Sequence, residues 1–399
     1  MSNRILFVDD EPMLLKGLER SLHGMRNEWE MEFVPGGLEA LAAMSQAPFD
    51  VVISDMRMPG MDGAQLLDQV RTRFSQTVRM VLSGQSDKAA VFRAIRPTHQ
   101  YLSKPCDIEE LKQKLRCALA LRDVLDSADL KQRVSQIESV PSQPALFEAM
   151  WMQLESADPN LLEAADTVSR DPGMTAKLLQ LVNSAFLGTA SSLSCPRQAL
   201  SIIGLDNLRS LVLSGGLFSE LSAALAERLA PIWRHSYASA RFAQAIARCE
   251  EARGAMVQDC YAAGLLHEIG WIVLGSTYGE EFDRLCSKLN QEIAGEKREE
   301  EVFGSAHGPV GAYLLGLWGL SDPIVEAVAA HHAPRNVNPT IFSPLLAVHV
   351  AEHWDRQWHG TPGFSENDEI DEDLLTHLGL KERLPLWEKK CREVDESRG

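Results

Sequence analysis

The chain has 399 residues, and at roughly 150 residues for an average domain this length predicts two or three domains. A hydrophobic share of 45% can fill their cores, but the longest apolar stretches fall short of the roughly 20 residues that a membrane span needs. The formal net charge is -17, and the excess acid lies outside residues 1–122, which hold 16 basic and 16 acidic side chains. An acidic remainder of this kind opposes direct DNA binding.

The cysteines and the first residues bear on the cellular compartment. Seven scattered cysteines without CxxC pairing suit reduced structural thiols better than a disulfide frame or a zinc site. The N-terminus enters a strand pattern at once and lacks the apolar region of a secretory signal. We therefore expect a cytoplasmic protein that does not contact a membrane.

Short apolar runs alternate with amphipathic helical patterns over residues 1–122. The expected strands are 5–9, 31–34, 51–55, 80–83 and 100–103, and the expected helices are 12–22, 38–44, 65–74, 88–95 and 108–121. Apolar runs without polar alternation are typical of strands that are buried on both faces of a parallel sheet. The pattern predicts a doubly wound α/β domain with a five-stranded parallel sheet.

The rest of the chain is helical in pattern. The helical signal continues from residue 108 toward 134, which predicts a helical linker over 123–139 that acts as a semi-rigid arm. Two prolines within 140–144 interrupt it, so we expect an all-α domain over 140–340 and a helical C-terminal extension with an acidic segment over 341–399. The expected helices are 161–170, 174–182, 196–203, 207–215, 230–249, 258–274, 278–289, 296–302, 307–318, 322–331 and 344–354.

Polar side chains stand where successive strands end, which is where open parallel sheets place their ligand sites. They are Asp9, Asp10, Asp55, Ser83 and Lys104. Asp10 and Asp55 can hold Mg²⁺, a hard cation that prefers oxygen ligands, with Asp9 reaching it through water. Asp55 would also be the nucleophile that forms an acyl phosphate. Lys104 and Ser83 would contact the phosphate oxygens.

The motifs around these residues resemble the receiver domain of two-component response regulators across essentially all of residues 1–122. They are Val8-Asp9-Asp10-Glu11-Pro12, Ser54-Asp55-Met56-Arg57-Met58-Pro59-Gly60-Met61-Asp62-Gly63, Leu82-Ser83-Gly84 and Tyr101-Leu102-Ser103-Lys104-Pro105. The resemblance implies phosphorylation of Asp55 by a histidine kinase and a metal ligand in the Arg57 carbonyl. It also implies a cis peptide between Lys104 and Pro105 and a switch pair of Ser83 with Tyr101.

A second set of residues follows the order of the HD phosphohydrolase superfamily, in which His and Asp bind catalytic metals. It consists of His235, His267, Glu268, His307, His331 with its neighbour His332, and Glu352. Both carboxylates are one methylene longer than the Asp of that superfamily. The Lys and the Gly-Tyr-Pro segment of its cyclic di-GMP phosphodiesterases are missing here. A receiver-controlled, metal-dependent phosphohydrolase of nucleotides or cyclic dinucleotides is therefore the alternative hypothesis.

Residues 140–354 resemble HDOD, the HD-related output domain. The matching motifs include Val140-Pro141-Ser142-Gln143-Pro144, Asp171-Pro172-Gly173-Met174-Thr175-Ala176-Lys177, Val182-Asn183-Ser184-Ala185-Phe186 and His331-His332-Ala333-Pro334. The resemblance implies a signalling module that acts through downstream protein partners, with homodimerisation left open. We therefore expect non-enzymatic output without a bound metal, and a vestigial metal site at His235, His267, Glu268, His307, His331 and Glu352.

Overall fold

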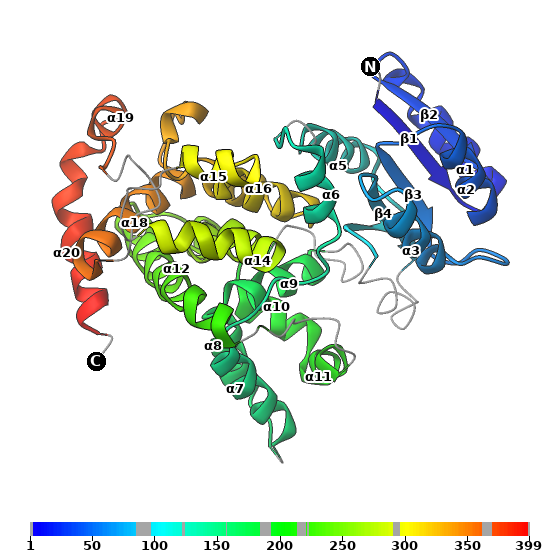
Figure 1. Ribbon diagram of the computed structural model, residues 1–399. Helices are drawn as coiled ribbons and strands as arrows, with labels where there is room; N and C mark the ends of the chain where they lie inside the picture. The colour runs from blue at the N-terminus through cyan, green and yellow to red at the C-terminus, as the bar shows by residue number, and fades with distance from the viewer. Residues whose placement is uncertain are drawn as a thin grey trace. The chain divides into compact units, whose positions relative to one another are not determined.

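A computed structural model describes residues 3–84, 97–121, 124–156, 158–183, 193–213, 221, 223–289, 296–360 and 369–397. The chain divides into two compact units, and each is described by itself. The first unit consists of Met1–Glu138, Gln180–Ser192 and Gly316–Gly319, and the second consists of Ser139–Leu179, Leu193–Leu315 and Leu320–Gly399. Figure 1 shows the strands in the blue to cyan part of the chain and helices alone from green to red.

Five parallel strands form the sheet of the first unit, in the order β2-β1-β3-β4-β5. The strands are β1 Asn3–Val8, β2 Trp29–Val34, β3 Val51–Asp55, β4 Val78–Gly84 and β5 Gln100–Lys104. The helices are α1 Pro12–Ser21, η1 His23–Met25, α2 Gly37–Gln46, α3 Gly63–Arg73 and α5 Ile108–Ala120. This arrangement confirms the predicted doubly wound parallel sheet. The helix predicted at 88–95 lies outside the described residues.

The sheet is held by apolar side chains that alternate between its two faces. All five residues of β3 are buried. On one face, Leu6 and Val52 belong to a core cluster that also contains Leu66 and Val70 of α3 and Leu41 of α2. Because every strand runs in the same direction, the carboxyl ends of β1, β3, β4 and β5 lie at one edge of the sheet.

The linker is not one continuous helix, so the predicted arm is wrong for the residues described. α5 ends at Ala120, and a separate helix, α6, spans Ala128–Ser135. Ser127 starts α6 because its side chain accepts a hydrogen bond at the helix N-terminus, a strong initiation signal. α6 also packs back on the sheet, since the buried Arg79 of β4 donates through Nη2 to the Ser135 carbonyl at 2.8 Å.

The described residues of the second unit contain helices and no strand, as predicted for an all-α domain. They are α7 Pro144–Glu155, α8 Leu161–Ser169, α9 Pro172–Val182, α10 Pro196–Ile203, α11 Leu205–Leu213, α12 Ala223–Cys249, α13 Gly254–Leu266, α14 Ile269–Leu289, α15 Glu296–Phe303, α16 His307–Leu317, α17 Asp322–Ala330, η4 Pro334–Val337, α18 Pro344–His359, α19 Glu372–His377, η5 Lys381–Arg383 and α20 Leu384–Glu396. α7 was not predicted. Pro144 interrupts the linker pattern but occupies the first turn of α7, where its missing N–H costs nothing.

Asp171 joins the start of the second unit to α9. Its two carboxylate oxygens accept hydrogen bonds from the backbone N–H groups of Gln143 at 2.7 Å and Met174 at 2.8 Å. A Cβ on Gly173 would lie 2.6 Å from the Val140 carbonyl oxygen, so only glycine allows this approach. The segment at the start of the second unit and the start of α9 therefore pack directly against each other.

The end of the C-terminal extension, α20, packs back on α12. Trp387 of α20 is fully buried, and its Nε1 donates to Glu250 at 2.7 Å, just beyond the end of α12. Arg383 forms an ion pair with the same carboxylate at 2.7 Å. The extension is therefore held by polar contacts to Glu250 as well as by the burial of Trp387.

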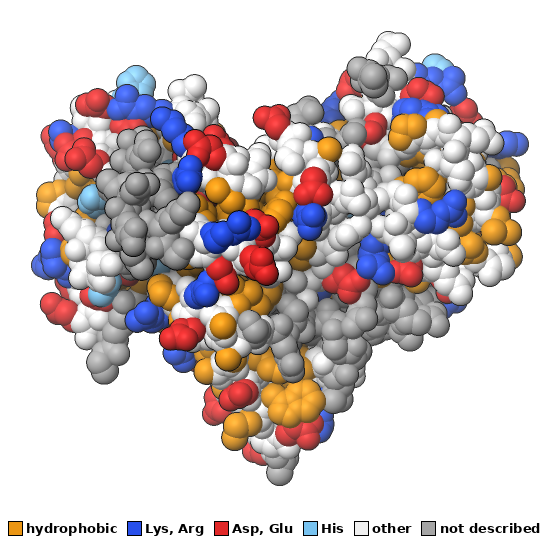
Figure 2. All heavy atoms as spheres, in the orientation of Figure 1, with side chains coloured by type: hydrophobic (Ala, Val, Ile, Leu, Met, Phe, Trp, Pro, Cys, Tyr) orange, Lys and Arg blue, Asp and Glu red, His pale blue; other side chains and the backbone are white. Residues whose placement is uncertain are grey.

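Surface side chains are mixed in charge. On the face shown in Figure 2, Lys and Arg side chains are scattered among Asp and Glu. Apolar side chains gather at α7, where Trp151 is 37% and Met152 72% exposed, and Leu162 at the start of α8 is 56% exposed. Of the helices that the structure describes, none has both the length and the apolarity to cross a membrane.

Candidate functional site

The first candidate site lies at the carboxyl edge of the parallel sheet. Asp9 and Asp55 are buried there, and Lys104 at the end of β5 reaches both of them. Its Nζ donates to Asp9 Oδ2 at 2.7 Å and also to Asp55 Oδ1. Burial lowers the pKa of Lys104, but its bonds to Asp55 and Asp9 outweigh burial and raise that pKa above its usual value. Asp10 follows Asp9 with an exposed side chain.

The loop after β3 holds the Asp55 carboxylate in place. The backbone N–H of Arg57 donates to Asp55 Oδ2 at 2.7 Å. A Cβ at Gly63 would lie 2.2 Å from the Asp55 carbonyl oxygen, so the first residue of α3 has to be glycine for the loop to close. Asp62 caps α3 through a reciprocal capping box with Gln65. The Arg57 N–H and the close approach of Gly63 therefore hold Asp55, the candidate nucleophile, in a fixed position.

The structure also places the predicted switch residues. Ser83 pairs in register with Ser103 on the neighbouring strand, and its side chain lies outside what the structure describes. Tyr101 is buried in the core cluster, and burial raises the pKa of its hydroxyl. The peptide bond between Lys104 and Pro105 is cis.

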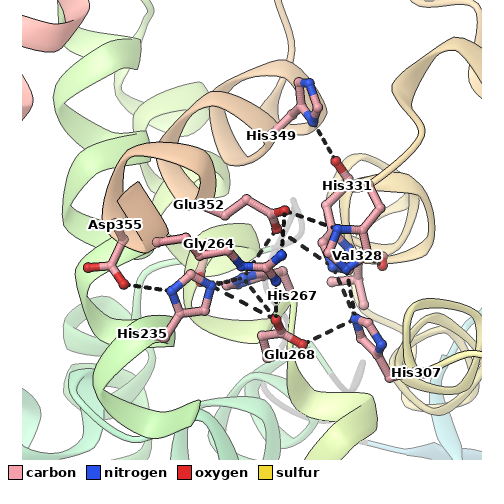
Figure 3. Close-up of polar contacts among 12 residues, drawn as sticks. His235, Gly264, His267, Glu268, His307, Val328, His331, His349, Glu352 and Asp355 are labelled. Carbon is pink, nitrogen blue, oxygen red and sulfur yellow. Dashed lines mark hydrogen bonds and ion pairs between the residues drawn. The ribbon is translucent and has the colours of Figure 1, made fainter. Parts of the chain in front are cut away.

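The second candidate site is a buried cluster in the helical unit (Figure 3). Its side chains come from α12, the α13–α14 junction, α16, the end of α17 and α18. The candidate ligand atoms form two groups, which we call the first and second groups, and the atoms within each group all lie within 4.8 Å of one another. The first group is Glu268, His307, His331 and His332, and the second is His235, His267 and Glu352. All seven side chains are buried.

Glycines at helix crossings bring these residues together. The helix predicted at 258–274 is divided into α13 and α14 by His267 and Glu268. A Cβ at Gly270 would lie 1.9 Å from the His307 carbonyl oxygen, so α14 begins directly against α16. A Cβ at Gly264 would lie 2.8 Å from the Cα of Ala240, so α13 also packs closely against α12. Side chains from separate helices can therefore converge.

The outer ring nitrogens of the cluster are held by acceptors. Nδ1 of His267 lies 2.8 Å from the Gly264 carbonyl oxygen, and Nδ1 of His331 lies 2.9 Å from that of Val328. Because a carbonyl can only accept, each of these nitrogens carries the proton. Carboxylates hold two further rings, with His235 Nδ1 2.6 Å from Asp355 and His307 Nδ1 2.8 Å from Glu299. Outer partners of this kind orient metal-binding imidazoles.

The inner ring nitrogens then face one another. Nε2 of His267 lies 3.1 Å from that of His235, and Nε2 of His307 lies 3.2 Å from those of His331 and His332. A neutral imidazole with its proton on Nδ1 presents a lone pair at Nε2. Between His235 and His267, two facing lone pairs cannot form a hydrogen bond, but both can bind a cation between them. His307 instead carries a proton on Nε2 at neutral pH, and a cation bound there would displace that proton. The donor set fits a divalent transition metal such as Fe, Mn or Zn.

The charges of the cluster are tightly coupled. Burial lowers the pKa of His267 to about 4. Burial also lowers the pKa of His307, but the charges of Glu299 and Glu268 outweigh it and raise that pKa to about 9. Burial raises the pKa of Glu268, whereas the neighbouring His307, His267 and Arg356 together hold it well below its usual value. The carboxylates are therefore ionised and able to bind a cation.

Three further residues border the cluster. Arg356, one turn after Glu352, donates through Nη2 to Glu268 Oε1 at 3.0 Å. Nδ1 of His349 lies 2.7 Å from the His331 carbonyl oxygen, and its Nε2 accepts from the Asp371 N–H at 3.0 Å. The buried indole of Trp271 has its ring centroid 5.7 Å from that of His307.

Comparisons with known families divide the chain at the same place as the two kinds of fold. Residues 5–116 match the response regulator receiver domain, and residues 140–334 match the HDOD domain. The chain is a response regulator with an HDOD domain. This response regulator is 26% identical over 304 residues to an uncharacterized protein of Treponema pallidum (strain Nichols), which covers 74% of this chain and 55% of that protein.

Other relatives of this response regulator match a shorter part of the chain. The DNA-binding transcriptional regulator NtrC of Salmonella typhimurium is 38% identical over 104 residues, which is 26% of this chain and 22% of NtrC. The chain thus spans between about a fifth and a little over half of the length of these curated relatives.

Solved structures are also similar to this response regulator. The signal receiver domain of an HD domain-containing protein from Pseudomonas fluorescens Pf-5 is 32% identical, covers 30% of this chain and 96% of that chain, and has a TM-score of 0.29. The MmoQ response regulator of Methylococcus capsulatus is 21% identical, covers 60% of this chain and 98% of that chain, and has a TM-score of 0.45.

The structure brings the six predicted histidine-cluster residues together with His332, which the sequence had named only as the neighbour of His331. It adds three residues that were not predicted, Glu299, Asp355 and Arg356. His332 directly follows a predicted ligand, and Arg356 follows Glu352 at the i, i+4 spacing that places two side chains on one helix face. Those two signals were present in the sequence, whereas nothing in it paired Glu299 with His307.

Proposed function

We propose that this response regulator accepts phosphate from a histidine kinase on Asp55. The observation that supports it most strongly is the position of Lys104, which bonds to both Asp9 and Asp55 at the carboxyl edge of the sheet. This lysine would become a counter-charge for the phosphate oxygens. Asp9, Asp10, Asp55 and the Arg57 carbonyl offer the oxygen ligands that Mg²⁺ prefers.

The proposed step is a phosphoryl transfer. A carboxylate oxygen of Asp55 forms a bond to the phosphorus of the kinase phosphohistidine. The bond between phosphorus and the imidazole nitrogen breaks, and its electron pair stays on the imidazole that leaves. Mg²⁺ would neutralise charge on the transferring group. We assign Ser83 and Lys104 to contacts with the acyl phosphate. Pro105 would fix the conformation of the chain after Lys104. Tyr101 would respond to phosphorylation at the edge of the sheet.

Intact-protein mass spectrometry tests this proposal directly. The full chain is incubated with acetyl phosphate and Mg²⁺, and one phosphoryl group is expected on the wild type and none on Asp55→Asn. Asp68→Asn is the matched control, because Asp68 is an exposed carboxylate on α3. Equal phosphorylation of wild type and Asp55→Asn would contradict the assignment of Asp55.

We propose that the HDOD domain passes on the phosphorylation state mainly through protein partners. The exposed Trp151, Met152 and Leu162 on α7 and α8 support this, because exposed apolar side chains that gather on a surface favour protein contact. Added charge at Asp55 can bias a two-state element. Scattering profiles of wild type and Asp55→Asn, each with and without beryllofluoride, should differ for the treated wild type alone. Four identical profiles would contradict a relayed change.

The second candidate function is a metal-dependent phosphohydrolase, and one observation favours it. The inner nitrogens of His235 and His267, and of His307 and His331, face each other at 3.1 and 3.2 Å with their outer nitrogens held by acceptors. The first and second groups would hold the metal. A divalent ion there would supply Lewis-acid chemistry. The chain's own contribution would be to orient the imidazoles through Gly264, Val328, Glu299 and Asp355.

Metal content and turnover separate the two candidates for the HDOD domain. Protein purified without chelator is analysed for Fe, Mn and Zn and assayed against nucleotides and cyclic dinucleotides. Hydrolysis that disappears in His267→Ala but persists in His377→Ala, an exposed histidine on α19, would favour the enzyme. Bound metal without turnover would favour an ion that stabilises or regulates a binding module.

A further inference from the structure

Arg356 brings a permanent positive charge into the histidine cluster. Arg356 on α18 is 7% exposed, and its guanidinium does not lose its proton in proteins. Its Nη2 lies 3.0 Å from Glu268 Oε1, and its Nη1 lies 3.7 Å from Glu352 Oε1. Glu268 belongs to the first group and Glu352 to the second. One arginine therefore lies against a carboxylate from each group.

The two oxygens of Glu268 face different groups. Oε2 lies 3.1 Å from Nε2 of His307 in the first group. Oε1 lies 3.8 Å from Nε2 of His267 and 3.9 Å from Nε2 of His235, both in the second group. Glu268 thus offers one carboxylate oxygen to each group. The oxygen that would face the second ion is the one that Arg356 holds.

Arg356 opposes an ion in the second group in two ways. Its hydrogen bond occupies Glu268 Oε1, which leaves His235, His267 and Glu352 as the second group's own ligands. Its charge also lies within a few ångströms of that position, and like charges repel more strongly in a buried site than in water. The first group keeps Glu268 Oε2 and its three imidazoles. A single ion should therefore favour the first group.

We infer that Arg356 limits the HDOD cluster to one divalent ion, held by Glu268, His307, His331 and His332. The guanidinium supplies the positive charge that a second cation would otherwise supply beside His235, His267 and Glu352. This inference rests on the proposed metal binding by the HDOD domain. It concerns how many ions the cluster accepts and which group accepts them.

Ion stoichiometry tests the inference without any assay of activity. The full chain is dialysed against Mn²⁺ together with Mg²⁺, which should fill the receiver pocket, and bound manganese is measured by elemental analysis. We expect one Mn²⁺ in the wild type and two in Arg356→Gln, with spin coupling between the two ions in the electron paramagnetic resonance spectrum. Arg356→Lys is the matched control, because it keeps the charge and should keep one ion. Two ions in the wild type, or one in a folded Arg356→Gln, would overturn the inference.

Two histidine variants assign the ion to a group and remain informative if Arg356→Gln does not fold. His235→Ala should retain one Mn²⁺, because the second group is unused, whereas His332→Ala should weaken binding of that ion at least tenfold. Loss of the ion in His235→Ala would overturn the inference while leaving the metal proposal intact. No specific Mn²⁺ in the wild type or in Arg356→Gln would instead refute metal binding itself, and the inference with it.

Discussion

The receiver pocket and the histidine cluster each pair two buried carboxylates with one basic side chain, but they differ in access. In the pocket, Lys104 forms ion pairs with Asp9 and Asp55, and the neighbouring Asp10 is exposed. In the cluster, Arg356 forms ion pairs with Glu268 and Glu352, and all seven candidate ligands are at most 5% exposed. The pocket is thus suited to exchange a group with a donor in solution. The cluster is suited to retain a small ion.

The choice of basic residue follows the same division. Lysine carries a compact charge on a flexible stem, so Lys104 can turn from a carboxylate to an incoming phosphate. Arginine carries a planar guanidinium that keeps its charge when buried, so Arg356 on α18 can remain fixed against Glu268 at the α13–α14 junction. Three predictions test this contrast, beginning with the largest expected effect, and a fourth concerns a buried carboxylate outside both sites.

Gly270→Ala should damage the cluster and spare the pocket. The new Cβ would lie 1.9 Å from the His307 carbonyl oxygen, so α14 and α16 must separate. We expect a loss of more than about 3 kcal/mol in the free energy of unfolding of the helical unit, measured by chemical denaturation. Gly17→Ala is the control, because nothing lies within 4 Å of its Cβ and alanine should stabilise α1 by about 0.5 kcal/mol. Similar stabilities for the two variants would refute the close-packing argument.

Lys104→Gln should impair the pocket and leave the cluster intact. Without the ammonium, Asp9 and Asp55 lose their shared cation, and the transferring phosphate loses a positive donor. We expect the rate of phosphorylation by acetyl phosphate to fall on the order of 100-fold, followed by mass spectrometry. Lys112→Gln on α5 removes a lysine from an ion pair with Glu109 and should leave the rate unchanged. A wild-type rate in Lys104→Gln would remove this lysine from the proposed mechanism.

Glu299→Gln should weaken ion binding by the cluster while leaving phosphorylation unchanged. Glu299 accepts the His307 backbone N–H at 2.6 Å and lies 2.8 Å from its Nδ1, so it orients the ring and makes it a stronger donor. Loss of such an outer carboxylate lowers metal affinity roughly 10-fold to 100-fold. Mn²⁺ titration of this variant beside Glu301→Gln, whose carboxylate is exposed, checks the effect. Equal affinities would show that the outer carboxylate does not tune the site.

Asp171 offers the smallest effect, as a buried carboxylate held by backbone N–H groups. Burial raises its pKa to about 6 from an ordinary value of 3.8, although those N–H groups oppose the shift. The folded state therefore binds the proton more tightly than the unfolded state between these values. This contribution to stability is complete below pH 3.8 and is lost as the pH rises through about 6.

The pH dependence of unfolding measures this contribution. We expect the free energy of unfolding to lose about 2 kcal/mol between pH 4 and 6.5 from Asp171 alone. Asp171→Asn should flatten that part of the curve, whatever it does to the absolute stability. A slope unchanged by the substitution would show that the carboxyl does not titrate in this window.

The sequence predicted the pocket more completely than the cluster, and the reason is local geometry. Asp9, Asp55 and Lys104 each stand at the end of an apolar run, and parallel strands bring such ends to one edge whatever the details of packing. Cluster residues come from separate helices, whose crossings depend on close approaches such as that of Gly270. Sequence order could gather the histidines as a set. It could not reveal that Glu299 holds His307 or that Arg356 lies against Glu268.

Helix boundaries show the same limit. The separate α5 and α6 and the unpredicted α7 both depend on single residues at helix starts, Ser127 and Pro144. A serine inside a helical pattern and a proline after a linker are each compatible with more than one local structure. Tertiary packing selects among them, as the bond from Arg79 to the Ser135 carbonyl shows.

Trp271 gives the helical unit an optical reporter at its centre. Its indole is fully buried, with the ring centroid 5.7 Å from that of His307. Indole fluorescence responds to charged and paramagnetic neighbours at this range. A Mn²⁺ ion on His307 should therefore quench part of the tryptophan emission, and Trp271→Phe should abolish that part. Occupancy of the cluster could then be followed in the intact, unlabelled chain while Asp55 is being phosphorylated.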